Sequence, residues 1–375
     1  MSSLLERLEA PGPKRILALD GGGIRGAITL GFLERIEDLL RKRHNNPDLR
    51  LCDYFDLMGG TSTGAIIASG LAIGMSAKEI KELYLELGSQ IFGSKTSLFK
   101  RLNAKFKIEA LEEELTKIFG DMPMSSDGIK TGLCIVTKRA DTGSTWPLLN
   151  HPKAKYYKYN KDILLRKAVR ASTAAPTYFK PEAFDVGQGQ IGAFVDGGVS
   201  MHNNPAMQLF LLATLKGFPY QWPTGADQLL LVSVGTGRWE SRQKVEDVTD
   251  NKLWDWATEV INMLMKDAGE MNELFLQYLS QSPTARELDS EIGDLSKDVL
   301  GPQASMSYLR YNATLEKDNL TDLGFPEVEP SSLYEMSEAK NSTILASIGS
   351  SSAARDVLDE HFPADFDRAE MRKTD

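Results

Sequence analysis

The chain has 375 residues, of which 42% are hydrophobic and 25% are charged, values typical of a globular protein with one large α/β domain or two smaller ones. The formal net charge of -9 argues against non-specific binding of a nucleic-acid polymer. The two cysteines, Cys52 and Cys134, lie beside apolar residues, as buried free thiols do. The four histidines are not paired at ligand spacing, so no metal site is expected.

Residues 1–15 carry charges where a signal peptide would need an apolar stretch. The chain also lacks an apolar run of about 18 residues, the length that a membrane-spanning helix requires. We therefore expect a soluble protein of the cytoplasm.

Two strand–loop–helix units follow one another near the N-terminus. The first joins an apolar strand at residues 16–19, the glycine loop Asp20–Gly26 and an amphipathic helix at residues 27–43. The second joins a strand at residues 54–58, a glycine-rich turn and a helix that begins near residue 65. Two strands joined through a helix imply a right-handed parallel crossover, which brings both loops to the carboxyl edge of one sheet, where α/β proteins bind ligands.

The turn in the second unit has the sequence Gly60-Thr61-Ser62-Thr63-Gly64. This G-x-S-x-G pattern is typical of a nucleophile elbow, in which a strained turn holds a serine out above a helix N-terminus. Glycine is needed because neighbouring backbone passes too close for a Cβ atom, and the helix end favours developing negative charge. The pattern predicts that Ser62 is a catalytic nucleophile and that Gly60 and Gly64 shape the turn.

The glycine loop permits two interpretations, because Gly21, Gly23 and Gly26 also match the G-x-G-x-x-G fingerprint of dinucleotide-binding proteins. That fingerprint needs an acidic residue after the second strand to hold a ribose, and Gly59 and Gly60 stand there instead. Consecutive backbone N–H groups at a helix N-terminus can also hold an oxyanion, and we favour this use. A dinucleotide-binding oxidoreductase is kept as the alternative.

Further along the chain, buried strands are expected at residues 133–137, 191–195, 229–234 and 306–314. No clean linker divides the chain, but its character changes near residue 240. We therefore distinguish two parts, a catalytic domain and a helical extension of unassigned role that packs on the same domain. Their bounds are residues 14–240 and 241–375.

Three segments carry apolar or charged patterns with more than one interpretation. The helix expected at residues 251–281 is rich in Trp and Met, which suits membrane docking or a lid, although packing on the core is the simpler interpretation. Residues 93–106 mix cations with apolar side chains and suit either an anionic membrane surface or a solvated loop. A helix is expected at residues 334–360, with a serine-rich interruption at 350–352.

A serine nucleophile needs a base within hydrogen-bond reach, and the sequence offers three candidates. Asp196 ends a strand and is expected at the same sheet edge as Ser62. His202 precedes a helix cap, and His361 lies late in the chain, as the histidine of an α/β hydrolase does. Asp196 is preferred, although its ordinary pKa of about 3.9 is low for a base at pH 7 and has to be raised by burial.

Taken in this order, Asp20–Gly26, Gly60–Gly64 and Asp196–Gly198 resemble the motifs of the patatin-like phospholipases. Three further blocks agree with that family: Ala171–Phe179, Asn203–Pro205 and Ser233–Gly237. Each block alone is weak, but six in sequence are specific, and together they span roughly the catalytic domain defined above. The resemblance implies a three-layer α/β/α sandwich with a mostly parallel central sheet.

The resemblance also implies a mechanism, the hydrolysis of an acyl ester in a phospholipid or related lipid through an acyl-enzyme. Ser62 would be the nucleophile and Asp196 the base, without a metal or other cofactor. The backbone of the glycine loop would stabilise the oxyanion. The residues carried over for this loop are Gly21, Gly22, Gly23 and Arg25, and the structural glycines of the three motifs are Gly26, Gly60, Gly64, Gly197 and Gly198.

The partner implied by the resemblance is a phospholipid or membrane surface, contacted transiently from the cytoplasm. Some bacterial members of the family lack a signal peptide, as this chain does, and serve in antiviral defence, switched on by a cyclic nucleotide. A cyclic-nucleotide activator is kept open, and so is a homo-oligomer. A catalytically inactive scaffold that binds membranes or partners is a further alternative, against which the intact Ser62 and Asp196 argue.

Overall fold

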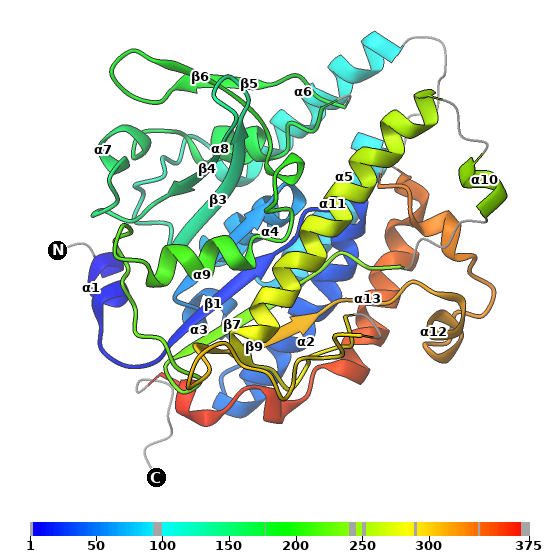
Figure 1. Cartoon of the computed structure of the whole chain (residues 1–375). Coiled ribbons are helices and arrows are strands. Elements are labelled where there is room, and N and C mark those ends of the chain that lie inside the picture. The colour runs from blue at the N-terminus through cyan, green and yellow to red at the C-terminus, as the bar shows by residue number, and fades with distance from the viewer. Residues whose placement is uncertain are drawn as a thin grey trace.

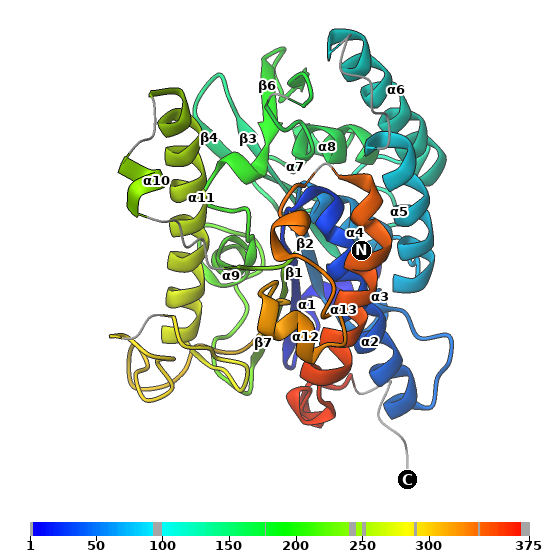
Figure 2. The same ribbon diagram turned by 90° about the vertical axis from the view of Figure 1, so that its right-hand side faces the viewer.

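The chain folds as a three-layer α/β/α sandwich around a mostly parallel sheet, which confirms the expected architecture (Figures 1 and 2). The computed structural model describes residues 3–92, 100–176, 178–239, 245–249, 253–288, 291–336 and 338–368. Within these residues the sheet has nine strands. They are β1 (Lys14–Leu19), β2 (Leu57–Thr61), β3 (Gly132–Arg139), β4 (Ser144–Leu149), β5 (Glu182–Asp185), β6 (Ile191–Asp196), β7 (Leu229–Val234), β8 (Ser280–Gln281) and β9 (Met306–Tyr311).

The strand order places the two glycine-rich loops side by side. Along the sheet the order is β5-β6-β3-β2-β1-β7-β9-β8, and β4 pairs with β3. Neighbouring strands from β3 to β8 are parallel, whereas β4, β5 and β6 pair antiparallel. Every residue of β1, β2 and β7 is buried, because helices cover both faces of these central strands. Since β1 and β2 are adjacent, the loops that follow them meet at one edge.

Helices cover both faces of the sheet, and each face has its own apolar core. One face packs against α2, α4, α5, α6, α8 and α13, and the other against α1, α9 and α11. Among the described residues, no helix is both long enough and apolar enough to cross a membrane. The helices are α1 (Ser3–Glu9), α2 (Gly26–His44), α3 (Leu51–Tyr54), α4 (Thr63–Ala72), α5 (Ala77–Phe92), α6 (Lys100–Phe119), α7 (Tyr157–Asn160), α8 (Leu165–Ser172), α9 (Ala206–Thr214), α10 (Val245–Thr249), α11 (Leu253–Tyr278), α12 (Lys317–Asp322) and α13 (Ser342–Asp356).

The sheet and the core both continue past residue 240. β9 pairs in parallel with β7, so the strand expected at residues 306–314 is present and extends the central sheet. α13 crosses α2 at Gly31 and Gly349, where a Cβ atom on Gly31 would lie 2.5 Å from the Gly349 carbonyl carbon. Such a close helix crossing requires glycine on both sides. The division of the chain at residue 240 stays a prediction, and the packing does not mark it as a boundary.

Two local predictions were wrong, and one lies outside the described residues. Tyr54 belongs to the short helix α3 rather than to the next strand, because the Asp53 carboxylate accepts a 2.8 Å hydrogen bond from the Arg50 N–H and caps a helical turn. The expected interruption at residues 350–352 is absent, since Ser350 bonds back to the Ala346 carbonyl inside a continuous α13. Of the basic stretch, residues 93–99 lie outside the described residues.

Candidate active site

Ser62 lies where β2 ends and α4 begins, in a backbone conformation that side chains rarely adopt. Its φ is +55° and its ψ is -123°, as a strained nucleophile turn requires. The two motif glycines let the backbone cross beneath it. A Cβ atom on Gly60 would lie 2.1 Å from the carbonyl group of Gly64, and one on Gly64 would lie 2.1 Å from the Leu19 carbonyl oxygen. The G-x-S-x-G spacing therefore reflects close packing of β2 and α4 against the end of β1.

The structure brings Asp196 to Ser62. The Ser62 hydroxyl donates a 2.6 Å hydrogen bond to Oδ2 of Asp196, and Oδ1 accepts a 2.7 Å bond from the Gly198 N–H. We expected Asp196 at the end of a strand on this edge of the sheet, and β6 ends there. β6 runs antiparallel to β3, with Asp196 opposite Thr137, next to where β3 pairs with β2. A returning hairpin, rather than a crossover helix, delivers the carboxylate.

The environment of Asp196 changes its basicity. The side chain is buried, with 5% of its surface exposed. Burial raises the pKa of Asp196 to about 6, although the hydrogen bonds from Ser62 and Gly198 partly oppose this rise. A carboxylate with this pKa is mostly ionised at pH 7 and is a stronger base than an ordinary aspartate. The raised pKa thus supplies the basicity that an aspartate needs to accept a proton from a serine.

Fewer backbone N–H groups of the glycine loop are available to bind an oxyanion than the sequence suggested. The Gly21 N–H donates to the Asn203 carbonyl at 3.0 Å, and the Arg25 N–H donates to the Gly22 carbonyl at 3.2 Å. Among the described residues, the N–H groups of Gly22 and Gly23 make no hydrogen bond. The backbone donors left for an oxyanion are therefore those of Gly22 and Gly23, one and two residues beyond the Gly21 amide.

Side chains from several elements hold this loop from outside. The carbonyl oxygen of Gly21 accepts a 3.1 Å bond from the Thr236 hydroxyl, and that of Gly23 accepts bonds from Thr63 and Tyr84. A Cβ atom on Gly22 would lie 2.3 Å from Oγ1 of Thr236. The loop is therefore fixed before any substrate arrives, as preorganised stabilisation of an oxyanion requires.

The side chain of Arg25 stacks on an aromatic ring. Its guanidinium lies 4.6 Å from the ring centroid of Trp239, which stacks in turn on Tyr334. Burial lowers the pKa of Arg25 to about 10, with Glu335 acting in the opposite direction. Arg25 thus anchors the loop by stacking on an aromatic ring.

Ser172 supports the nucleophile, and sequence reasoning did not single it out. Its hydroxyl oxygen accepts a 2.8 Å hydrogen bond from the Ser62 N–H and donates a 2.6 Å bond to the Val136 carbonyl. These two bonds tie the strained turn to β3 and fix the direction of the Ser62 backbone. The only available signal was a serine within the block Ala171–Phe179, which we had used only as a family motif.

Neither alternative base reaches Ser62. His202 lies nearby, and its carbonyl oxygen accepts a 2.6 Å bond from the Thr61 hydroxyl. Its Nδ1 atom, however, has no hydrogen-bond partner among the described residues. His361 lies within 3.0 Å of the Tyr311 hydroxyl through Nδ1 and lines a separate cavity. The geometry therefore favours Asp196 over both histidines.

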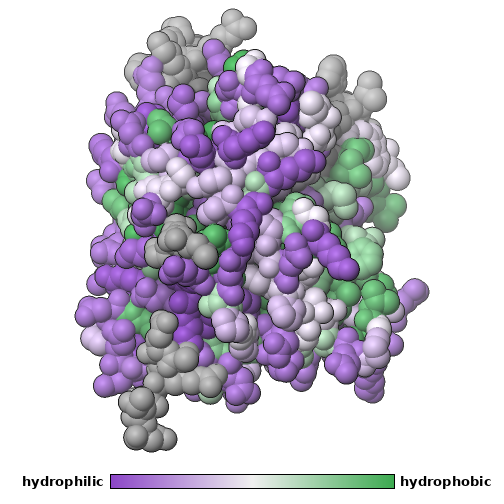
Figure 3. Space-filling model, turned by 90° about the vertical axis from the view of Figure 1, so that its left-hand side faces the viewer, coloured by the Kyte–Doolittle hydropathy of each residue, from purple (hydrophilic) through white to green (hydrophobic). Residues whose placement is uncertain are grey.

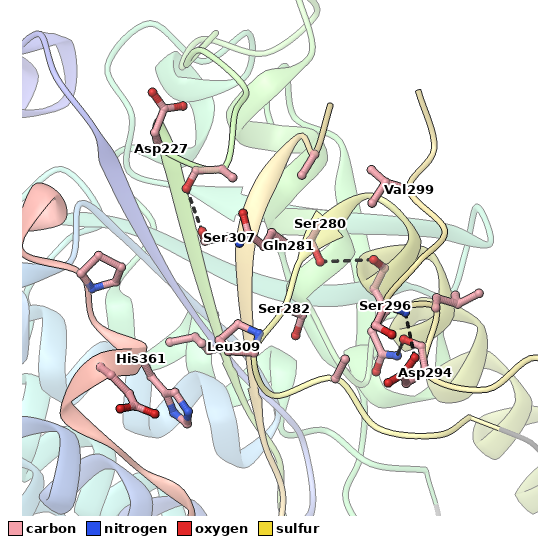
Figure 4. Close-up of a pocket in the computed structure, with 18 of the residues that line it drawn as sticks. Asp227, Ser280, Gln281, Ser282, Asp294, Ser296, Val299, Ser307, Leu309 and His361 are labelled. Carbon is pink, nitrogen blue, oxygen red and sulfur yellow. Dashed lines mark hydrogen bonds between the residues drawn. The ribbon is translucent and has the colours of Figure 1, made fainter. Parts of the chain in front are cut away.

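The cavity at His361 has a volume of about 780 Å³, and its lining includes neither Ser62 nor Asp196 nor any residue of the glycine loop (Figure 4). It lies beside β8 and β9, and its described lining includes no lysine or arginine. Its acidic residues are Asp227, Asp294, Glu360 and Asp365. Across the described parts of the chain, no group of three or more His, Cys, Asp or Glu residues is arranged to hold a metal ion.

Comparison with known proteins gives a consistent family. Residues 17–210 match the model of the patatin-like phospholipase family. Patatin-16 of Solanum tuberosum is 30% identical over 291 residues, which cover 71% of this chain and 72% of the relative. Patatin group D-2 of the same species is 30% identical over 298 residues, with 72% and 74% covered. The crystal structure of VipD from Legionella pneumophila covers 90% of this chain and 67% of its own, at 13% identity, and its TM-score of 0.37 is too low to support a conclusion.

Proposed function

The chain belongs to the patatin-like phospholipase family and is a lipid acyl hydrolase, and on this premise we propose that Ser62 and Asp196 hydrolyse carboxylic esters of phospholipids as a catalytic dyad. The 2.6 Å hydrogen bond between the Ser62 hydroxyl and Oδ2 of Asp196 carries the proposal. It joins a strained serine at a helix N-terminus to a buried carboxylate of raised pKa. Activation by an adjacent base is what a serine nucleophile needs.

In the first half of the reaction, Asp196 takes the proton of the Ser62 hydroxyl while Oγ attacks the ester carbonyl carbon. The tetrahedral intermediate then collapses, its bond to the alcohol oxygen breaks, and Asp196 returns the proton to that oxygen. The lysolipid leaves and the acyl group stays on Ser62. In the second half, Asp196 takes a proton from water while the water oxygen attacks the acyl carbonyl carbon. The second tetrahedral intermediate collapses, its bond to Oγ breaks, Asp196 returns the proton to Oγ of Ser62, and the fatty acid leaves.

The N–H groups of Gly22 and Gly23 stabilise the negative charge of the carbonyl oxygen in both intermediates. This role is supported by their lack of hydrogen bonds within the described residues and by the side chains that hold the loop. The N-terminus of α4, which begins directly after Ser62, adds a positive dipole on the same side. These groups are in place before the reaction, so little reorganisation is needed.

The test compares the wild type with Ser62→Ala and Asp196→Asn on a soluble short-chain nitrophenyl ester and on phosphatidylcholine vesicles. Each variant should lose about 10³-fold or more in kcat on both substrates, because the nucleophile and base act as a unit. Matched controls are Ser347→Ala, an exposed serine on α13, and Asp38→Asn, an exposed aspartate on α2, and both should retain wild-type rates. Full activity in Asp196→Asn would assign the base to another residue.

Membership of the family does not decide whether a cyclic nucleotide activates this enzyme in antiviral defence. The cavity of Figure 4 does not favour it, because its described lining has four carboxylates and no cation to pair with a phosphate. Hydrolysis rates measured with and without cyclic dinucleotides test this activation, and equal rates would exclude it. A wild type that is inert on both esters, with or without these nucleotides, would favour the inactive scaffold.

A further inference from the structure

One face of α11 exposes an apolar stripe, which the exposed Asp267 interrupts between Leu264 and Met271. Its members follow one another at helical spacing on the outer side of the helix: Trp256, Val260, Met263, Leu264, Met271 and Phe275. Leu264 is the most exposed of them, at 64%. In Figure 2, α11 runs along the outer side of the molecule, with α10 beside it and α9 nearer to the sheet. Figure 3 shows hydrophobic side chains gathered along the side on which α11 runs. Exposed apolar patches of this kind mark interaction sites.

The opposite face of α11 is firmly attached to the protein. Leu276 is fully buried in the core between α9 and the sheet. Glu273 forms a 2.7 Å ion pair with Arg286 and approaches Arg310 at 3.9 Å. Because the inner face is packed and charge-paired, the apolar stripe is a fixed outer surface of the folded protein.

The stripe adjoins the segment that carries the proposed base. Asn272, next to Met271 on α11, donates to the carbonyl oxygen of Met201 at 2.5 Å and to that of Asn204 at 3.5 Å. Val199 and Met201 follow Asp196 by three and five positions, and both are exposed, Met201 at 59%. The buried Asn272 thus ties α11 to the loop after Asp196, and this loop exposes two apolar side chains of its own.

We propose that this surface, made of the α11 stripe with Val199 and Met201, docks on a phospholipid bilayer and presents the Ser62 edge to it. The proposal rests on the proposed function, since a lipid acyl hydrolase has to reach ester groups near the headgroups. Amphipathic helices that lie on membranes bury their apolar face roughly 5–10 Å into the boundary between headgroups and acyl chains, which is the depth of those esters. The bilayer is therefore the occupant that the chemistry of the neighbouring site selects.

The charges on α11 define the kind of membrane. Asp267 lies within the stripe, and the exposed charged residues beside it are Lys266 and Glu270, so the described surface has no cationic cluster. Docking is then driven by burial of apolar side chains rather than by attraction to anionic lipids. Binding should occur on phosphatidylcholine vesicles and should change little at about 0.5 M salt, where surface charges are screened.

The test uses the full chain with Leu264→Glu and Met271→Glu combined, and Leu215→Glu as the matched control. Leu215 is 47% exposed at the carboxyl end of α9, away from the stripe. In the double variant, sedimentation with phosphatidylcholine vesicles should fall about tenfold or more, because two apolar contacts become charges. The ratio of vesicle to soluble-ester hydrolysis should fall equally, and Leu215→Glu should match the wild type. Unchanged sedimentation of a folded double variant would overturn the proposal.

Two further measurements separate the docking surface from the dyad and from other occupants. Ser62→Ala should be inactive but should bind vesicles as the wild type does, so failure of the dyad and failure of docking are distinguishable. Binding that requires anionic lipid and disappears in high salt would contradict the proposal. Sedimentation velocity tests whether a second copy of the chain, rather than a bilayer, covers this surface. A wild-type dimer that dissociates in the double variant, without loss of vesicle binding, would assign the surface to self-association.

Discussion

In the proposed dyad, Asp196 has to be ionised before it can take a proton from Ser62, so activity should follow the titration of this one carboxyl group. Burial raises its pKa to about 6. We therefore expect kcat/KM on a soluble ester to be constant at pH 7–8 and about tenfold lower at pH 5, where only about one molecule in ten carries the ionised base. A pH–rate profile checks this, with Asp38→Asn as the control that keeps the wild-type shape. A profile without a decline below pH 6 would contradict the assigned base.

The same pKa shift makes Asp196 a destabilising residue at neutral pH. Its pKa in the folded protein lies above the ordinary 3.8, so between about pH 4 and 6 the folded state binds more protons than the unfolded state. Stability contributed by the protonated form is therefore lost as pH rises through this range. In the Asp196→Asn variant, the side-chain amide avoids the buried charge and can still accept from the Gly198 N–H. This substitution should raise the free energy of unfolding at pH 7.5 by about 2–3 kcal/mol.

Urea unfolding at two pH values measures this effect. The gain in Asp196→Asn should be largest at pH 7.5 and nearly absent at pH 4, because the wild-type carboxyl is then mostly protonated in the folded state. An equal gain at both pH values would show that the stabilisation has another cause, such as packing.

Part of this residue-level account was predictable from the sequence. Ser62 was indicated by its glycine spacing and by the strand and helix on either side. Ser172 was not, because a hydrogen bond between residues 110 positions apart depends on how two segments pack. The hydrogen bond from the Gly21 N–H to the Asn203 carbonyl could not be predicted either, because it also joins segments that are distant in the sequence.

At the scale of elements, the turn between β2 and α4 depends on backbone contact at Gly64. A Cβ atom there would lie 2.1 Å from the Leu19 carbonyl oxygen and 2.6 Å from its carbon, and neither backbone atom can move freely within the central sheet. Gly64→Ala should cost about 3 kcal/mol or more of unfolding free energy, the upper end of overpacking effects.

Gly217→Ala provides the matched control, because nothing lies within 4 Å of the added atom. Its effect should stay within about 1 kcal/mol. Thermal or urea unfolding of Gly64→Ala and Gly217→Ala tests this prediction. Equal free energies of unfolding would contradict the close packing of β2 and α4 against β1.

The elements themselves were largely predictable, but their pairing directions were not. β1, α2, β7 and the long helix α11 appear where apolar periodicity placed them. Residues 191–195 were also correctly identified as a strand, yet nothing in an apolar run states that β6 returns antiparallel along β3. Strand direction is decided by long-range pairing, so the sequence did not reveal how β6 brings Asp196 to Ser62.

At the scale of the whole molecule, a buried ion pair joins two ends of the chain. Arg310 on β9 donates to both carboxylate oxygens of Asp20, at 2.7 Å and 3.1 Å, and Asp20 begins the glycine loop. Removing either partner leaves a buried charge, so Arg310→Met or Asp20→Asn should each cost about 3–5 kcal/mol of unfolding free energy. A double-mutant cycle by urea unfolding checks this.

The combined variant should lose much less stability than the sum of the two single variants, because it removes both charges together. Additive losses would mean that the pair does not couple the late strand to the loop. This ion pair could not be predicted from the sequence, because 290 positions separate Asp20 from Arg310 and no motif includes Arg310. It also shows why residues after 240 matter to the site even though the family motifs end before them.

The most direct test of the dyad is covalent labelling by a fluorophosphonate, which reacts with activated serines, followed by peptide mass spectrometry at pH 7.5. The structure predicts a single labelled residue, Ser62, and a labelling rate that falls about 10³-fold in Asp196→Asn. Labelling at another serine, or an unchanged rate in Asp196→Asn, would contradict the assignment of Ser62 and Asp196 as nucleophile and base.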